Sequence, residues 1–212
     1  MGRRALGSDP MQARSFELRG PRVTLRPLRN DDFEAWRDVR ISAHDWLTKW
    51  EPLPLAGHAD MTSDRRAFQS RCSVRDRDWQ LGTGYGFGLF VGRTFAGEVN
   101  VNSVQRGPFQ NAYVGYWIDE AQAGNGFVPE ALVLVFRFAF EELGLHRLQI
   151  SIIPRNKASR RVAEKLALRD EGTALRYLEI NGQWEDHVRY AVTSEDWFET
   201  RDEYVAKFLP FP

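Results

Sequence analysis

The spacing of apolar residues switches between two periods along the chain, and these periods predict a mixed α/β domain. Within residues 126–143 apolar positions recur every three or four residues, as on the buried face of a helix. Within residues 148–152 apolar and polar residues alternate, which is typical of a strand. From Phe16 onward no internal repeat and no long linker interrupts the pattern. We therefore expect one domain over residues 15–212.

The predicted elements follow an order that is typical of phosphate-binding α/β proteins. The first half begins with two short strands around Gly20–Pro21, a helix capped by Asn30, a segment 44–54 whose prolines stop a helix, and a helix from Thr62 or Ser63 to about Asp76. Strands follow within 85–91, 99–101 and 112–118, and then a helix 126–143 ended by Gly144. The last part has a strand 148–152, a helix 156–166, a hairpin around Asn181–Gly182 and a helix capped by Ser194. A strand, a glycine turn and a helix in succession commonly bind phosphate groups.

The first candidate binding motif is the segment 123–127, which joins the strand 112–118 to the next helix. Gly124 and Gly126 let the backbone approach a ligand closely. The free N–H groups and the dipole of a helix that starts here suit a pyrophosphate. An ordinary glycine turn before a helix accounts for these residues equally well, because short glycine patterns are common.

The second candidate motif opens the helix 156–166. Asn156 is expected to cap this helix, and the Ser159 hydroxyl, one turn further, would point beside the ligand channel. Arg160, Arg161 and Lys165 add positive charge nearby. For each of these cations by itself, a solvated helix face is the simpler explanation.

Composition limits the classes of function. Lys plus Arg and Asp plus Glu each number 29, so the net charge is zero and direct nucleic-acid binding is not expected. Cys72 is the single cysteine, so an internal disulfide is excluded and a cytoplasmic protein is favoured. We expect Cys72 to be a helix residue and not a nucleophile. No apolar run has the length of a membrane span, so no membrane association is expected. Residues 1–14 are expected to form a disordered tail, within which Met11 is a second candidate start.

Together, the two motifs resemble those of the GNAT superfamily of N-acetyltransferases. The likeness extends to Ala96–Gly97 and to residues 104–109, 113–117, 144–147 and 181–187. This series is similar to the bacterial ribosomal-protein alanine N-acetyltransferases, the Rim branch, over residues 15–200. The resemblance implies the GNAT fold, an α/β (α+β) arrangement whose mixed, mostly antiparallel sheet has a splayed strand pair and helices on both faces. It implies acetyl-CoA as cofactor, with CoA as product, and the N-terminal α-amine of a ribosomal or other protein, starting with Ala or Ser, as acceptor.

The resemblance also implies which residues bind the cofactor. One strand would lie along the pantetheine arm, the glycine loop would hold the pyrophosphate, and the start of the second helix would flank the thioester. These residues are Tyr116, Trp117 and Ile118 in the strand, Gln122, Ala123, Gly124, Asn125, Gly126 and Phe127 in the loop, and Asn156, Ser159 and Arg161 in the helix. Ala121 departs from the superfamily pattern, which has Arg or Gln there, but the backbone cradle does not depend on that side chain.

The resemblance implies direct attack of an amine on the thioester, which requires a neutral amine and a protonated leaving thiol. At pH 7 deprotonation costs about 1–1.4 kcal/mol for a chain α-amine and about 4.6 kcal/mol for lysine, so an N-terminal acceptor needs only a weak base. Glu98, on a central strand, is the first candidate base, and a rim carboxylate is its other interpretation. A relative's glutamate aligns with Leu178, which makes the neighbouring Glu179 the second candidate. Ser159 is the candidate hydrogen-bond donor to the thiolate.

The acceptor is expected to lie against the variable region that precedes residue 54. Glu51 would meet a charged amine and Trp46 and Trp50 would wall a peptide, although two core tryptophans are the alternative interpretation. Further substrate contacts are expected from Arg106, Phe109 and Tyr177. The four histidines are scattered and lack a cysteine partner, so no metal site is expected.

Two other functions fit the same motifs. A small-molecule acetyltransferase, acting on an antibiotic or a polyamine, would have a deep acidic pocket, whereas an open groove would favour a protein acceptor. A regulatory module would hold acetyl-CoA without transferring the acetyl group, and the hydroxyl of Ser159 and the carboxylate on the central strand argue against it. The sequence leaves a monomer and a homodimer open.

Overall fold

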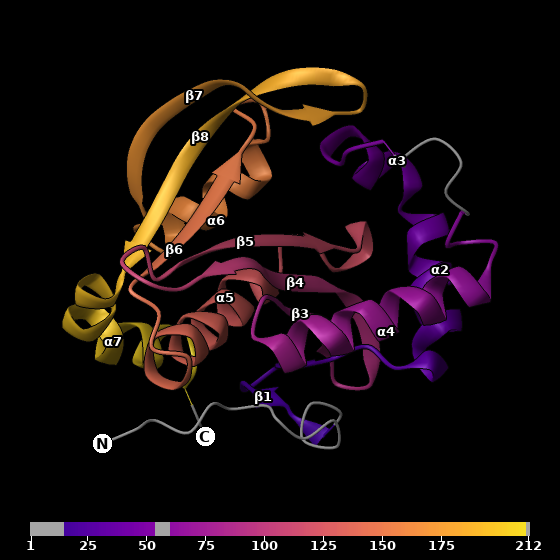
Figure 1. Ribbon diagram of the computed structural model, residues 1–212, viewed down its shortest axis with the longest axis horizontal. Helices are drawn as coiled ribbons and strands as arrows, with labels where there is room; N and C mark the ends of the chain where they lie inside the picture. Colours follow the sequence, from indigo (N-terminus) through magenta and orange to yellow (C-terminus); the bar gives the residue numbers. More distant parts are fainter. Residues whose placement is uncertain (1–14, 54–59, 211–212) are drawn as a thin grey trace.

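One eight-stranded sheet organises the protein (Figure 1), whose computed structural model describes residues 15–53 and 60–210. The strand order is β1-β2-β3-β4-β5-β6-β8-β7, and β5–β6 is the parallel pair among antiparallel neighbours. The strands are β1 Leu18–Arg19, β2 Val23–Arg26, β3 Tyr85–Val91, β4 Thr94–Gln105, β5 Asn111–Ile118, β6 Arg147–Ile152, β7 Arg169–Ile180 and β8 Gln183–Thr193. The sheet is therefore mixed and mostly antiparallel, as the sequence predicted.

Helices cover both faces of this sheet, because alternate strand residues are apolar on each side. The helices are α2 Phe33–Ser42, α3 His44–Leu47, α4 Arg65–Leu81, α5 Phe127–Arg137, α6 Lys157–Lys165 and α7 Ser194–Phe208, with 3-10 turns at Asn30–Asp32, Thr48–Trp50 and Glu120–Gln122. Val99 and Val101 share one core with α5, whereas Phe90 and Phe95 pack with Trp36 of α2 in a second core. Two apolar cores thus hold the central strands from opposite sides.

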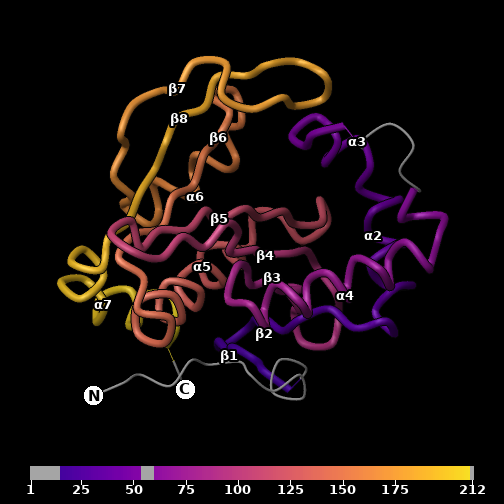
Figure 2. Tube along the Cα trace, viewed as in Figure 1, coloured from indigo at the N-terminus to yellow at the C-terminus, as the bar shows by residue number. Residues whose placement is uncertain are grey.

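Strands β5 and β6 separate soon after they meet. They pair through residues 111–113 and 147–149, and beyond these residues β5 continues beside β4 alone. Figure 2 shows the two traces leaving each other. Gly97 of β4 permits the close approach of β5, because a Cβ at this position would lie 2.2 Å from the carbonyl oxygen of Trp117. The predicted splayed pair is confirmed, and the gap between these strands is where the candidate site lies.

Several predicted helix boundaries are wrong, and at two helix starts a neighbouring polar side chain is the better cap. Asp64 accepts a hydrogen bond from the N–H of Arg66, so α4 begins after Asp64 and not at residue 62 or 63. The same helix continues past Asp76 to Leu81 because Trp79 is buried in the core. Thr193, not Ser194, caps α7 through a capping box with Asp196.

Two further boundaries also differ from the prediction. Asn30 lies inside a 3-10 turn and does not cap α2, since Asp32 accepts the hydrogen bond from the N–H of Arg29. The long helix predicted for residues 126–143 is α5 followed by a π-helical turn at Phe138–Glu142. The predicted tail, residues 1–14, lies outside the described residues. Within the part of the chain that the structure describes, no helix has both the length and the apolar character to cross a membrane.

Candidate active site

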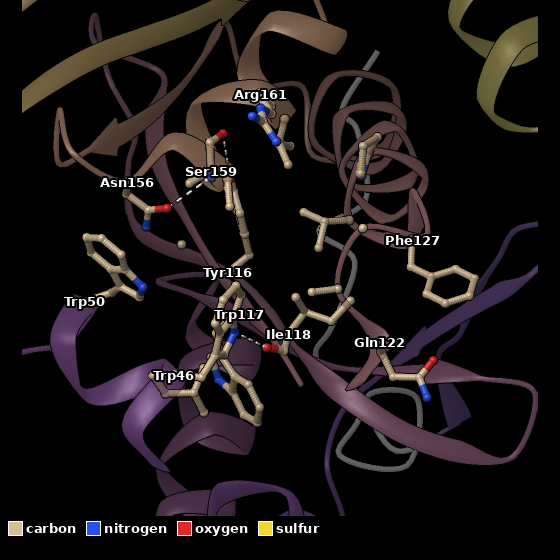
Figure 3. A pocket seen from close by; sticks show the side chains of 18 of the residues that line it. Trp46, Trp50, Tyr116, Trp117, Ile118, Gln122, Phe127, Asn156, Ser159 and Arg161 are labelled. Carbon is tan, nitrogen blue, oxygen red and sulfur yellow. Dashed lines mark hydrogen bonds between the residues drawn. The ribbon is translucent and has the colours of Figure 1, made fainter. Parts of the chain in front are cut away.

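A cavity of about 490 Å³ lies beside the end of β5 that has separated from β6, between this strand, the glycine loop and α6. Figure 3 shows the tryptophans of α3 and the following turn near one end, the glycine loop near the other, and Ser159 between them. Nearly all predicted cofactor residues line this cavity, namely Tyr116, Trp117, Ile118, Gln122, Ala123, Gly124, Gly126, Phe127, Asn156, Ser159 and Arg161. Tyr116 and Trp117 are strand neighbours and so face opposite sides of the sheet. The cavity therefore lies along the edge of β5, where residues of both orientations reach it.

The glycine loop presents an open helix start to the cavity. Gly124 and Gly126 both have φ near 82°, a left-handed conformation that favours glycine, and a Cβ at Gly124 would meet no atom within 4 Å. No side chain caps the N-terminus of α5, so the first N–H groups of the helix are left for a ligand. Arg161 and Lys165 line the same cavity and add positive charge. These features fit a pyrophosphate group.

Asn125 is the one residue of the predicted loop that does not line the cavity. Its side-chain amide donates to the carbonyl oxygens of Gln122, at 3.2 Å, and Ala123, at 3.4 Å. The side chain therefore shapes the turn from within and is not directed at a ligand.

A pair of hydroxyl groups lies in the middle of the cavity. The hydroxyl oxygens of Tyr116 and Ser159 are 2.7 Å apart, and the Asn156 side-chain oxygen accepts from the N–H of Ser159 at 3.1 Å. The cap predicted for Asn156 is thus confirmed. Burial raises the pKa of Tyr116, and the hydrogen bond with Ser159 offsets this only in part, so the phenol remains protonated at neutral pH. The sequence predicted Tyr116 only as part of the strand along the pantetheine arm, because nothing in the chain order shows that its ring reaches α6.

Two tryptophans and a carboxylate form the other end of the cavity. The indole N–H of Trp46 donates to the carbonyl oxygen of Ile118 at 3.1 Å, which fixes its ring against the end of β5. Trp50 and Glu51 also line the cavity. The Glu51 carboxylate accepts two hydrogen bonds from Arg40, at 2.6 and 2.7 Å. The structure thus places all three predicted residues together at one end of the cavity.

Arg40, which pairs with Glu51, stays charged although it is largely buried. Burial lowers the pKa of Arg40, but the hydrogen bonds and the charge of Glu51 outweigh that effect and raise it above its ordinary value. The guanidinium also lies 5.2 Å from the centre of the Trp117 ring. Glu51 is therefore held in place and largely neutralised by its partner.

The β7–β8 hairpin reaches over this end of the cavity and contacts the α3 region (Figure 1). At the hairpin tip, the N–H of Asn181 donates to the carbonyl oxygen of Glu51 at 2.9 Å. Beside it, the Arg155 guanidinium lies 5.0 Å from the centre of the Trp50 ring and pairs with Glu185 of β8. The hairpin predicted from Asn181–Gly182 thus packs beside the tryptophan end of the cavity without lining it.

The structure places Glu98, the first candidate base, away from the cavity. The Glu98 carboxylate is 2% exposed, does not line the cavity, and accepts hydrogen bonds from Trp36 at 2.8 Å and Arg71 at 2.5 Å. Burial by itself would raise the pKa of Glu98, but the charges of Arg71 and Arg75 and the two hydrogen bonds outweigh burial and lower it. The carboxylate is therefore an ionised partner in a buried network and does not line the cavity.

Four other predicted residues also lie away from the cavity, because the elements that carry them point elsewhere. Glu179 is exposed on the edge strand β7, opposite Trp184. Arg106 donates to the carbonyl oxygen of Leu143 at 2.8 Å, and Phe109 is 48% exposed in the β4–β5 connection. The Tyr177 ring packs on His187 with ring centres 5.7 Å apart. None of these four residues lines the cavity.

Asn100 lines the cavity and was not predicted. Its side-chain oxygen accepts from Arg75 at 2.9 Å, so the amide orientation is fixed. The alternation along β4 did place Asn100 on the same face as Glu98, which was the one available signal. Cys72 lies in α4 as predicted, and burial raises the pKa of its thiol to about 11, so it is not a nucleophile at neutral pH. Among the described residues, no group of three or more metal-ligating side chains gathers.

A cavity beside a splayed strand pair, with an uncapped helix start on one side and a hydroxyl pair midway, suits a ligand that carries a pyrophosphate group. The profile of a family described as the acetyltransferase (GNAT) domain matches residues 22–169. The chain belongs to the GNAT acetyltransferase family, and it is an N-acetyltransferase that uses acetyl-CoA.

Known relatives place the chain more narrowly within this family. It is 32% identical over 181 residues to the Bacillus subtilis protein named "Probable N-acetyltransferase YjcK", covering 84% of this chain and 98% of the relative. It is 33% identical over 170 residues to the Escherichia coli [ribosomal protein uS5]-alanine N-acetyltransferase, covering 78% of this chain and 86% of the relative. The structure of Mycobacterium smegmatis RimJ in complex with CoA-disulfide superposes with a TM-score of 0.81 at 30% identity, over 90% of this chain and 92% of that chain.

Proposed function

We propose that the protein transfers the acetyl group of acetyl-CoA to the N-terminal α-amine of a protein, most directly a ribosomal protein. The similarity to the Escherichia coli uS5-alanine enzyme and to the mycobacterial RimJ structure supports this acceptor class. The cavity supports it independently, through the charges at the end where the acceptor must enter.

The observation that carries the proposal is the state of the one carboxylate in the cavity. Among the described residues that line it, Glu51 is the only acidic side chain, and Arg40 already binds both of its oxygens. Because Arg40 balances its charge, the lining of the pocket carries no unpaired carboxylate that would favour a polycation. Because deprotonation costs about 1–1.4 kcal/mol for an α-amine and about 4.6 kcal/mol for lysine at pH 7, this site suits an α-amine better than a lysine or a polyamine.

The remaining chemistry belongs to the hydroxyl pair. Acetyl-CoA, when bound, supplies the thioester that the amine attacks. Ser159, with its N–H capped by Asn156 and its hydroxyl beside that of Tyr116, is positioned to donate a hydrogen bond to the departing sulfur. Neither hydroxyl has a basic partner among these contacts, which supports direct attack over an acetylated enzyme. The Glu51 carboxylate is positioned to orient the incoming ammonium before a water accepts its proton.

Mass spectrometry of defined acceptors tests this proposal. The protein and acetyl-CoA are incubated with peptides that begin with Ala or Ser, with the same peptides blocked at the N-terminus and carrying an internal lysine, and with spermidine. Acetylation of the free N-termini is expected, and the blocked peptides should stay unmodified. Acetylation of lysine or spermidine alone overturns the acceptor class. Binding of CoA with no acetylation of any acceptor would instead support the regulatory module.

A further inference from the structure

A buried carboxylate at the start of α5 points away from the cavity. Glu130 lies in the first turn of the helix, and its side chain is 0% exposed. It accepts hydrogen bonds from the N–H of Arg22 at 2.8 Å, the N–H of Val23 at 3.0 Å and the Arg22 side chain at 2.7 Å. Gly20 makes this contact possible, because a Cβ there would lie 2.6 Å from a Glu130 oxygen. The start of α5 is thus tied to the β1–β2 turn.

The same arginine also binds the glycine loop. Its two terminal nitrogens donate to the carbonyl oxygens of Asn125, at 3.0 Å, and Gly126, at 3.4 Å. Its guanidinium lies 5.1 Å from the centre of the Phe127 ring. One side chain, 108 residues before Glu130 in the sequence, therefore holds the carboxylate of the helix and two consecutive carbonyls of the loop together.

This arrangement determines where the loop N–H groups point. In a trans peptide unit the C=O and the next N–H point in opposite directions. Since Arg22 holds the carbonyls of Asn125 and Gly126, the N–H groups of Gly126 and Phe127 are directed away from Arg22. Gly126 and Phe127 both line the cavity, so these N–H groups are oriented for an anion there.

The pairing also removes an electrostatic obstacle. A carboxylate in the first turn would oppose an anion bound at the same helix start. The Arg22 guanidinium neutralises Glu130 directly, so the partial positive charge of the uncapped helix remains available. A buried carboxylate at this place is therefore compatible with pyrophosphate binding only because Arg22 is present.

We propose that Arg22, together with Glu130, is a positioning residue for the pyrophosphate of acetyl-CoA. Arg22 does not line the cavity, and it acts by orienting the loop and neutralising the helix start. The proposal rests on the cofactor assignment and is independent of which amine is acetylated. Its signature is a selective loss of affinity for the pyrophosphate-containing part of the cofactor.

Calorimetric titration of CoA into variants of the full chain tests this role. Arg22→Ala is expected to raise the Kd of CoA at least about tenfold, because charged hydrogen bonds that orient the loop are lost. Transfer from S-acetylpantetheine, which lacks the pyrophosphate, should keep its kcat/KM, and kcat at saturating acetyl-CoA should stay within about twofold. Arg19→Ala is the matched control, since this exposed arginine of the same hairpin pairs with Glu17.

Arg22→Lys keeps the charge and the pairing with Glu130 but cannot reach both carbonyls, so it separates orientation from folding. A folded Arg22→Lys variant is expected to bind CoA several times more weakly than wild type. Wild-type Kd for CoA in this variant overturns the proposal. An equal loss with acetyl-CoA and S-acetylpantetheine in either variant also overturns it, since that pattern reports a general structural defect.

Discussion

The hydroxyl oxygens of Tyr116 and Ser159 lie 2.7 Å apart, one on β5 where this strand has separated from β6 and the other in the first turn of α6. The tyrosine is buried and keeps its proton, because burial raises its pKa. A protonated phenol next to a serine can pass hydrogen-bond polarisation to it without becoming charged. The pair therefore supplies a neutral donor in the middle of the cavity over the whole physiological pH range.

Removing either hydroxyl should slow the chemical step and leave cofactor binding nearly intact. We expect Ser159→Ala to lower kcat by about 10²-fold, within the range for lost acid assistance to a leaving group. Tyr116→Phe should lower kcat less, since its hydroxyl acts through Ser159. Steady-state kinetics gives the kcat values, and titration of CoA checks that its Kd changes little. Unchanged turnover in Ser159→Ala would contradict the assignment. Ser73→Ala, which changes an exposed serine of α4, is the control.

Because of the buried Glu98 network, the free energy of unfolding should fall at acidic pH. Because the folded-state pKa of Glu98 is lowered relative to the unfolded chain, its contribution is complete above the unfolded value near ~4.3 and is lost as pH falls through the folded pKa. Glu98→Gln should therefore cost about 3 kcal/mol at pH 7, and the difference from wild type should shrink below about pH 4. Urea unfolding between pH 3 and pH 7 measures both. A pH-independent difference would contradict this explanation.

Gly97 should tolerate no side chain, because its Cβ would collide with backbone and not with a movable side chain. An added Cβ would lie 2.2 Å from the carbonyl oxygen of Trp117 and 2.9 Å from the Cα of Ile118. We expect Gly97→Ala to destabilise the fold by about 1–3 kcal/mol, measured by urea unfolding. Gly115→Ala is the matched control on the facing strand, where the nearest atom is 3.9 Å away. Equal stabilities of the two variants would rule out the steric explanation.

Glu51 should affect the acceptor and not the cofactor. Glu51→Gln leaves the shape of the side chain but weakens the pairing with Arg40 that holds this end of the cavity in place, so the KM for an Ala-initiated peptide should rise about tenfold. The KM for acetyl-CoA should not change. Glu179→Gln, on the exposed edge strand, is the control and should alter neither constant by more than about twofold. A larger fall in turnover for Glu179→Gln than for Glu51→Gln would contradict this prediction and would support Glu179 as the base.

What the sequence determined about this protein is local. The glycine turn at Gly124 and Gly126, the Asn156 cap and the Asn181–Gly182 hairpin each depend on backbone conformations that neighbouring residues specify, and all three are found in the structure. Helix starts were less predictable, because Asp64 and Thr193 compete with adjacent polar residues for the same N–H groups. Resemblance to a family then supplied the fold class and the cofactor.

What only the tertiary structure decided concerns side chains that meet across the sheet. The sequence pattern of β4 made Glu98 a candidate base, but in the folded chain Glu98 is a buried, ionised partner of Trp36 and Arg71. Tyr116 was predicted only as part of the strand along the pantetheine arm, yet its hydroxyl forms a hydrogen bond with Ser159, 43 residues later. Sequence periodicity shows which face a residue occupies and not what packs on that face. Such pairs depend on how strands and helices dock, and only the folded chain brings them together.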